Sequence, residues 1–212
     1  MYCIDKDILL HLKSLVFDRD VEYCSLFEEG DIVDGHQKLE YSFQEEREGI
    51  KLNNRQGCAT EKIGIYKVRS HPFGEHSYPS PEDLMVMVKH RFIKLSVIAT
   101  NWGVYMIKQN GKKLNYYDTL KDRIEEVMND LNEFLLREIE PIESYLGGRE
   151  TPHQLNYVVI PDVNTRFDFL GDDLGLDIKI YPWFELNLDK KRERENEDTD
   201  ADKPKIKRKR KM

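Results

Sequence analysis

Apolar residues recur at two different spacings along this 212-residue chain, and the alternation of these spacings constrains the fold more than any other feature. In three segments every third or fourth residue is apolar, which predicts amphipathic helices. In shorter segments between them the apolar residues alternate or form short β-branched runs, which predicts strands. Helices and strands in this order predict an α/β or α+β layer structure, a mixed β-sheet flanked by helices.

The spacings also give approximate bounds for each element. Apolar residues at helical spacing run over 4–16, where Asp5 fits the N-cap, and over 84–92, and a long helix is predicted at 120–140. The predicted strands are 21–27, 39–43, 63–68, 94–100, 104–109, 114–117, 157–160 and 176–181. Asp34-Gly35 and Asn101-Trp102-Gly103 predict tight connections, whereas the polar residues 47–61 predict a loop and Gly147-Gly148 a break.

The last 24 residues differ from the rest of the chain in charge and in apolar content. Residues 189–212 contain eleven Lys or Arg and seven Asp or Glu, which gives them a charge of +4. Because the net charge of the whole chain is −7, the residues before 189 carry −11. Almost no side chain of 189–212 is apolar, so we expect a disordered tail. We therefore predict a folded domain at 1–140, a C-terminal strand-containing extension at 141–188 that packs on it, and the charged tail at 189–212.

A basic cluster ends this tail and has two interpretations. It consists of Lys205, Lys207, Arg208, Lys209, Arg210 and Lys211. Such a cluster is typical of a segment that binds an import receptor or a polyanion, and it would equally serve as a solubilising tail. The acidic body makes a poor nucleic-acid surface, so any such binding depends on the tail.

Cysteine usage and apolar content bound the compartment. Cys3, Cys24 and Cys58 are an odd number without zinc-finger spacing, which favours reduced thiols. No run approaches the eighteen apolar residues of a membrane span, and the N-terminus lacks the basic start and cleavage site of a secretory signal. We therefore expect an intracellular protein, cytoplasmic or nuclear, that does not associate with a membrane.

The stretch SHPFGEHSYPSPED, residues 70–83, carries the most chemistry. One interpretation is structural: Ser80 is a good N-cap, Pro81 suits the first helical position, and Asp83 completes a capping box. The other is chemical: a strand that ends at His71 and a helix that begins near Asp83 can bring an imidazole and a carboxylate to one point. A catalytic zinc takes three such ligands and a water, which a nearby carboxylate deprotonates.

At this stretch the chain resembles the MPN/JAMM family of metalloenzymes. The family motif is a glutamate on an early strand, then His-x-His-Pro, seven residues and Ser-x-x-Asp. His71-Pro72, the seven residues that follow, and Ser80-Pro81-Glu82-Asp83 match this spacing. The resemblance covers roughly residues 4–140. It implies Glu22 as general base, Ser80 as the serine that assists the oxyanion, and His71 and Asp83 as zinc ligands.

One position departs from the motif, because Arg69 stands where the family has its first histidine. A guanidinium has no lone pair to donate and repels a cation, so it cannot replace that ligand. We expect Arg69 to pair with Glu22 or Asp83 instead. His76 is the best candidate for a substitute ligand if its loop folds inward.

The other candidate side chains have weaker arguments. Cys24 shares the strand face of Glu22, although a small buried core residue is the simpler interpretation. His90 is about 10 Å along the helix from Asp83, too far to share an ion. We expect His11, His36 and His153 to be ordinary histidines.

Three functions follow as hypotheses. The first is a zinc-dependent isopeptidase that acts on a ubiquitin-like conjugate, with zinc as the cofactor and Glu22 as its base. The second, which the substitution at Arg69 favours, is an MPN scaffold with an impaired metal site that pairs with another MPN domain or complex subunit. The third is a nucleic-acid-associated factor that acts through the basic tail.

Overall fold

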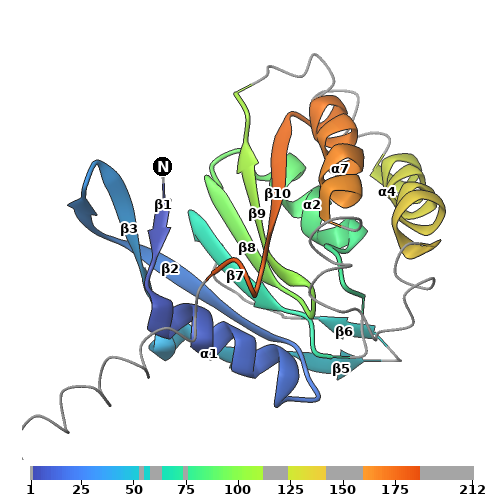
Figure 1. The fold of residues 1–212 in the computed structure, drawn as a ribbon. Coiled ribbons are helices and arrows are strands. Elements are labelled where there is room, and N and C mark those ends of the chain that lie inside the picture. The colour runs from blue at the N-terminus through green and yellow to red at the C-terminus, as the bar shows by residue number, and fades with distance from the viewer. Residues whose placement is uncertain are drawn as a thin grey trace, which may run out of the picture.

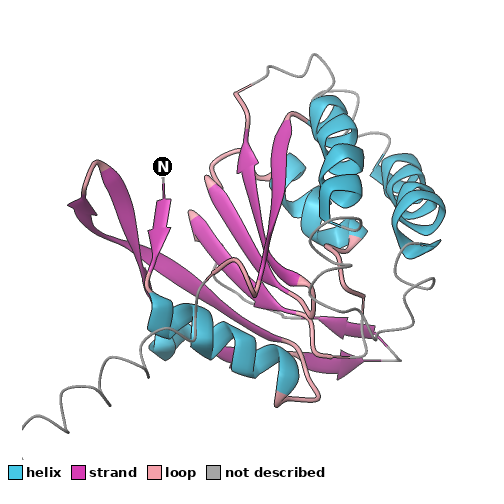
Figure 2. Cartoon of the chain, viewed as in Figure 1, coloured by secondary structure: helices cyan, strands magenta, loops and turns pink. Residues whose placement is uncertain are grey.

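The computed structural model describes residues 2–52, 55–57, 64–73, 76–111, 124–141 and 160–186, which form a curled mixed sheet with helices on both faces (Figures 1 and 2). The helices are α1 (Lys6–Phe17), α2 (Pro81–Lys89), α4 (Ile124–Phe134) and α7 (Ile160–Leu174), with the short turns η1 (Phe43–Glu45) and η2 (Leu135–Ile139). The strands are β1 (Tyr2–Ile4), β2 (Tyr23–Val33), β3 (His36–Tyr41), β4 (Arg47–Glu48), β5 (Ile50–Leu52), β6 (Arg55–Gly57), β7 (Tyr66–Ser70), β8 (Leu95–Ala99), β9 (Gly103–Gln109) and β10 (Leu176–Pro182).

The main sheet has the strand order β1-β3-β2-β7-β8-β9-β10, with β4 paired to β2, and β5 and β6 form a separate pair. Most neighbours run antiparallel, but β7 and β8 are parallel and are joined by the α2 crossover. This βαβ unit places the end of β7 beside the start of α2. In sheets of this kind, functional groups collect where parallel strands end and the crossover helix begins.

Two hydrophobic clusters, one on each face of the sheet, hold the layers together. On one face α1 buries Leu12, Leu15 and Val16 against side chains of β2, β3, β7 and β8. On the other face α2, η2 and α7 pack against β8, β9 and β10, with Phe167 and Tyr105 in edge-to-face contact. Every residue of β8 is buried, which is typical of a central strand covered on both faces.

The β2–β3 hairpin turns at the predicted Asp34-Gly35 pair. Both residues have positive φ, 51° and 76°, which suits the tight turn of a two-residue hairpin. Further along, the register shifts between Glu29 and Ile32, so the strands contain a bulge. Figure 1 shows this hairpin projecting beyond the neighbouring strands.

The C-terminal extension is part of the sheet, as predicted for 176–181. β10 pairs antiparallel with β9 along its whole length. Gly103 makes this pairing possible, because a Cβ there would lie 2.3 Å from the Tyr181 carbonyl oxygen. Beyond β10, the Trp183 indole donates a 2.8 Å hydrogen bond to the Thr100 carbonyl oxygen and is buried against the α1-side cluster.

Several predicted bounds were wrong. The segment 47–57 was predicted as a loop but contains β4, β5 and β6, because pairing with β2 or with a local partner offsets its polar composition. Ile160 was predicted to end a strand but begins α7, since a short apolar run alone does not distinguish helix from strand. Residues 114–117, 147–148, 157–159 and the tail 189–212 lie outside the described residues.

The prediction of three reduced thiols was also wrong for one cysteine. Cys24 is disulfide-bonded, whereas Cys3 is a free, exposed thiol, and Cys58 lies outside the described residues. Sequence spacing could not reveal this, because it does not say which cysteines meet in space. Within the described ranges, no helix is long and apolar enough to cross a bilayer.

Candidate functional site

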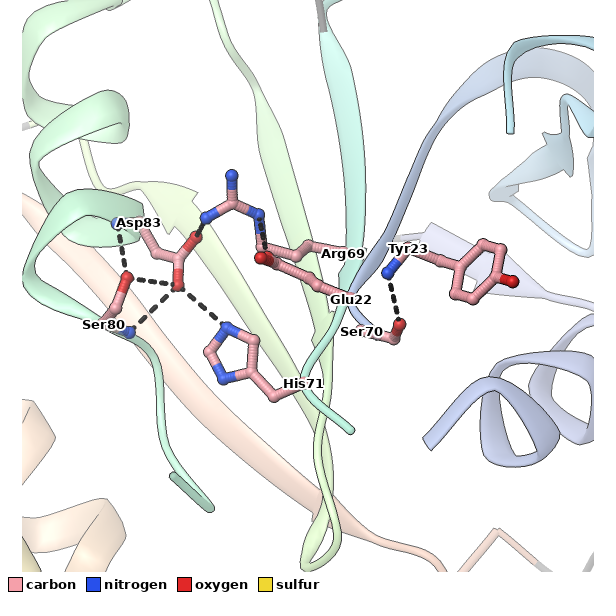
Figure 3. Close-up of polar contacts among 7 residues, drawn as sticks. All are labelled: Glu22, Tyr23, Arg69, Ser70, His71, Ser80 and Asp83. Atoms are coloured by element: carbon pink, nitrogen blue, oxygen red, sulfur yellow. Dashed lines mark hydrogen bonds and ion pairs between the residues drawn. The ribbon is translucent and has the colours of Figure 1, made fainter. Parts of the chain in front are cut away.

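Five side chains from three parts of the chain meet where β7 ends and α2 begins (Figure 3). Arg69 and His71 come from the end of β7, Ser80 and Asp83 from the start of α2, and Glu22 from the residue before β2. Together these five residues form the Asp83 cluster. The antiparallel pairing of β2 with β7 places Cys24 opposite Arg69, so Glu22, two residues before Cys24, reaches the same face of the sheet.

The start of α2 is the most fully bonded part of the Asp83 cluster. Ser80 is the N-cap: its hydroxyl accepts the Asp83 backbone N–H at 3.2 Å, and the Asp83 carboxylate accepts the Ser80 N–H at 2.9 Å. The Ser80 hydroxyl also donates to Asp83 at 2.8 Å. Pro81 occupies the first turn, so the predicted capping box is confirmed.

Arg69 lies between the two acidic side chains of the cluster. Its Nη1 donates to Asp83 Oδ1 at 2.6 Å, and its Nε lies 2.7 Å from Glu22 Oε1. The contact with Glu22 is an ion pair without hydrogen-bond geometry, so Asp83 is the stronger partner. Both carboxylates are nearly buried, with side-chain exposures of 5% for Glu22 and 6% for Asp83. The expectation that Arg69 pairs with Glu22 or Asp83 is confirmed, and Arg69 pairs with both carboxylates.

His71 completes the cluster. Its Nε2 lies 3.2 Å from Asp83 Oδ2, and its backbone N–H donates to the Ala99 carbonyl oxygen at 2.8 Å. Asp83 is therefore held by a guanidinium, an imidazole, a hydroxyl and a backbone N–H. Four donors therefore already contact this carboxylate, one at Oδ1 and three at Oδ2.

The charges of the cluster set the protonation states of its members. Burial alone would raise the pKa of the Asp83 carboxyl, but Arg69, then His71 and Ser80, outweigh it and hold this pKa well below its usual range. Burial alone would lower the pKa of His71, but the hydrogen bond to Asp83 and the charges of Asp83 and Glu22 raise it overall. For Arg69, Asp83 and Glu22 likewise outweigh burial and raise the pKa of the guanidinium.

Lys67 lies next to the Asp83 cluster, and the sequence interpretation missed it. It lies two residues before Arg69 on the same strand face, and burial followed by the charge of Arg69 lowers the pKa of its ammonium group. Lys67, Cys24, Arg69, Asp83 and Ser96 line a cavity of only about 10 Å³, which has room for no more than one water. The period-2 alternation from Arg69 would have pointed to Lys67.

The structure does not bring the remaining candidates into the cluster. His76 is exposed and its ring stacks on Tyr78 at 4.8 Å between centroids. Cys24 lies opposite Arg69 but is disulfide-bonded, so it offers no thiolate to a metal. His90 caps the far end of α2 against Phe92, and His153 lies outside the described residues. His36 contacts the Asp34 carbonyl oxygen, and His11 contacts Glu46.

The residues present do not fit a zinc ion. Only His71 and Asp83 match ligand positions, and the guanidinium that occupies the third position is a cation. Among the described residues, no three His, Cys, Asp or Glu side chains are grouped so as to hold a metal. What the cluster does provide is a rigid cross-link between β2, β7 and α2.

Comparisons with known proteins add no further constraint. No protein-family model matches this chain, and no curated protein or solved structure is significantly similar to it.

Proposed function

We propose that this chain is an MPN/JAMM-like domain in which Arg69 replaces a metal ligand, and that it serves as a binding or scaffold module. The observation that carries the proposal is the position of the Arg69 guanidinium, within 2.7 Å of Glu22 and 2.6 Å of Asp83. These are the two carboxylates that the motif assigns to the base and to a zinc ligand. A salt bridge thus stands where the family chemistry requires a divalent ion.

The arrangement of the motif residues supports the relationship to the family. Glu22, His71, Ser80 and Asp83 are separated by up to 61 positions in the sequence, yet they lie in one cluster. A mixed sheet covered by α1 on one face and by α2 and α7 on the other agrees with the resemblance. These features favour an MPN-like domain over an unrelated α/β fold with a chance motif.

The chemistry of the cluster argues against hydrolysis. Zinc lowers the pKa of a bound water to about 7, and a guanidinium that is already paired with two carboxylates offers no comparable activation. Glu22 is engaged by Arg69, so it is a poor base at this position. Without a nucleophile, the surface around the cluster can still recognise a ubiquitin-like protein or conjugate, or pair with a second MPN subunit.

The competing proposal is an active zinc isopeptidase with a substitute ligand. It requires His76 to turn inward from Tyr78, or Arg69 to leave both carboxylates. No contact of the described residues favours either movement.

The test is metal content, measured by mass spectrometry on the purified protein, on Arg69→His and on Arg69→Gln. The glutamine variant is the matched control, because it removes the same positive charge without adding a metal ligand. We expect stoichiometric zinc only in Arg69→His, since only that variant has three protein ligands. We also expect cleavage of a lysine-linked ubiquitin chain in that variant alone.

Two results would overturn parts of this proposal. Stoichiometric zinc and chain cleavage in the unmodified protein would establish the active enzyme. Failure of a folded Arg69→His variant to bind zinc would mean that these residues are not a family metal site, and the relationship to the family would be lost with it.

A further inference from the structure

The tip of the β2–β3 hairpin exposes two large apolar side chains. Ile32 is 72% exposed and Val33 is 49% exposed. They are consecutive in a strand, so they point to opposite faces of the hairpin. Each face of this projecting tip therefore carries one exposed apolar side chain that another chain could contact.

Four exposed carboxylates lie along this hairpin, two beside the tip and two further down the strands. Glu28, Asp31, Asp34 and Glu40 are all exposed, and no ion pair joins any of them to another described residue. Glu28 and Glu40 stand directly opposite each other across the hairpin. Like charges in that position destabilise a strand pair, so a cation bound between them would relieve the repulsion. The nearest lysine, Lys38, is already paired with Asp5 at 2.9 Å.

The chain leaves the described region on the α1 side of the sheet. Leu186, the last described residue, packs against the same core cluster that contains Leu39 of β3 and is flanked by Tyr2 and Ile4 of β1. β1 pairs with β3 at Gln37–Leu39, beside the hairpin. At roughly 3.3 Å per residue, the tip lies about 10 Å beyond Leu39.

The segment that follows has the length and the charge to reach the tip. Residues 187–204 separate Leu186 from the basic cluster 205–211, and a chain of that length spans up to about 60 Å when extended. The cluster contains Lys205, Ile206, Lys207, Arg208, Lys209, Arg210 and Lys211. Its six cations complement the carboxylates, and Ile206 complements the exposed apolar pair.

We propose that the basic segment 205–211 docks on the β2–β3 hairpin of its own chain, with cations at Glu28 and Glu40 and Ile206 against Val33. The docked segment is withheld from an import receptor or a polyanion. Binding of either ligand then competes with the hairpin, so the hairpin regulates the basic segment. The docking is independent of whether the Asp83 cluster holds a metal.

A zero-length carbodiimide crosslinker tests this on the full chain, because it joins only carboxylates and amines that touch. An equal mixture of isotope-labelled and unlabelled protein separates crosslinks within a chain from crosslinks between chains. We expect intrachain links from lysines of 205–211 to Glu28, Asp31, Asp34 or Glu40. We expect them to disappear in 1 M salt, where the screening length is about 3 Å.

A second acidic surface is the internal comparison. Asp168, Asp172 and Asp177 line a hollow of about 570 Å³ beside the start of β10. Links that map mainly to this hollow, links only between chains, or no links at all would each overturn the proposal.

The apolar part of the docking has its own test. Ile32→Ser/Val33→Ser keeps every hairpin carboxylate, so a several-fold lower crosslink yield would report loss of the apolar contact alone. Phe92→Ser/Phe169→Ser is the matched control, because these side chains are 52% and 73% exposed and lie away from the hairpin in the sequence. Equal yields in the two double variants would contradict the apolar contact.

Discussion

Two carboxylates, Asp83 and Glu46, each bind several donors, but they do so on opposite faces of the sheet and with different partners. Asp83 at the start of α2 holds Arg69, His71 and Ser80. Glu46, after η1, accepts the Tyr41 hydroxyl at 2.6 Å and lies 2.6 Å from His11 Nε2 of α1. Tyr41, His11 and Glu46 form the Glu46 cluster.

The difference lies in the charge of the partners. Arg69 is positive at every accessible pH, so Asp83 belongs to a permanent buried ion pair. Burial, then the hydrogen bond to Glu46, raises the pKa of Tyr41 against a small opposing effect of Ser25, so Tyr41 remains a neutral donor. A permanent counter-charge makes a buried carboxylate expensive to disturb, whereas a neutral donor such as the Tyr41 hydroxyl can be replaced at lower cost.

The largest expected effect is the removal of the guanidinium. Arg69→Met removes the permanent counter-charge that Glu22 and Asp83 share in a buried position, and we expect it to lower the free energy of unfolding by about 3–5 kcal/mol. Urea denaturation at pH 7 measures this. The control is Arg137→Met, whose pairing with Glu138 involves a 72% exposed side chain and should contribute little to stability.

A triple variant sharpens this result. Arg69→Met/Glu22→Gln/Asp83→Asn removes the whole charge set, so it should be more stable than Arg69→Met alone. If the triple variant is the less stable of the two, uncompensated charge is not the reason for the loss.

The second effect is that of Asp83 itself. We expect Asp83→Asn to lower stability at pH 7 by about 1.5–3 kcal/mol, the range for hydrogen bonds to charged groups. Because the pKa of Asp83 in the folded protein lies below its ordinary 3.8, its contribution is complete above pH 3.8 and is lost as the pH falls further. Urea denaturation from pH 7 to pH 3 should therefore show a shallower acid loss for Asp83→Asn than for the unmodified protein. An equal slope in both proteins would contradict the lowered pKa of Asp83. Asp168→Asn, at an exposed carboxylate, is the control.

The third effect compares the two clusters directly. Glu46→Gln keeps a side-chain oxygen that can accept the hydrogen bond from Tyr41, and it leaves no permanently charged cation without a partner. We therefore expect it to lower the free energy of unfolding by only about 0.5–1.5 kcal/mol at pH 7. Urea denaturation of this variant beside Arg69→Met tests the comparison. A loss equal to that of Arg69→Met would show that a permanent counter-charge is not what distinguishes the Asp83 cluster.

The two clusters also differ in how far the sequence revealed them. The spacing of His71, Ser80 and Asp83 fixed a strand end and a helix start at one place, and helical and strand periods gave α1, α2, β8 and β9 nearly in full. The Glu46 cluster joins α1 to a segment 35 residues away with no motif, so His11 was interpreted as an ordinary histidine. Local patterns specify local structure, whereas contacts between distant segments depend on register and packing.

The same limit explains the errors in the strands and in the site. β4 contains two exposed residues and forms because β2 offers an edge at Tyr23 and Cys24, which no local pattern records. The pairing of Arg69 with Glu22 or Asp83 was expected from its charge, but its contact with both depends on how β2 aligns with β7. Lys67 was missed because only its two-residue spacing from Arg69 on the same strand face marks it.

The smallest expected effect concerns His71, and it lies on the alkaline side. The pKa of His71 in the folded protein is above its ordinary 6.5, so its ion pair with Asp83 contributes fully below pH 6.5 and is lost as the pH rises through the raised value. As the pH rises through this range, the free energy of unfolding of the unmodified protein should fall by about 0.5–1 kcal/mol, which is less than the full net value of a strong hydrogen bond. The His71→Gln variant should show no such fall. Urea denaturation at pH 6 and pH 8.5 measures the difference, with His36→Gln at the exposed hairpin turn as control. If His71→Gln retains the alkaline loss, another group causes it, and Arg69 alone balances Asp83.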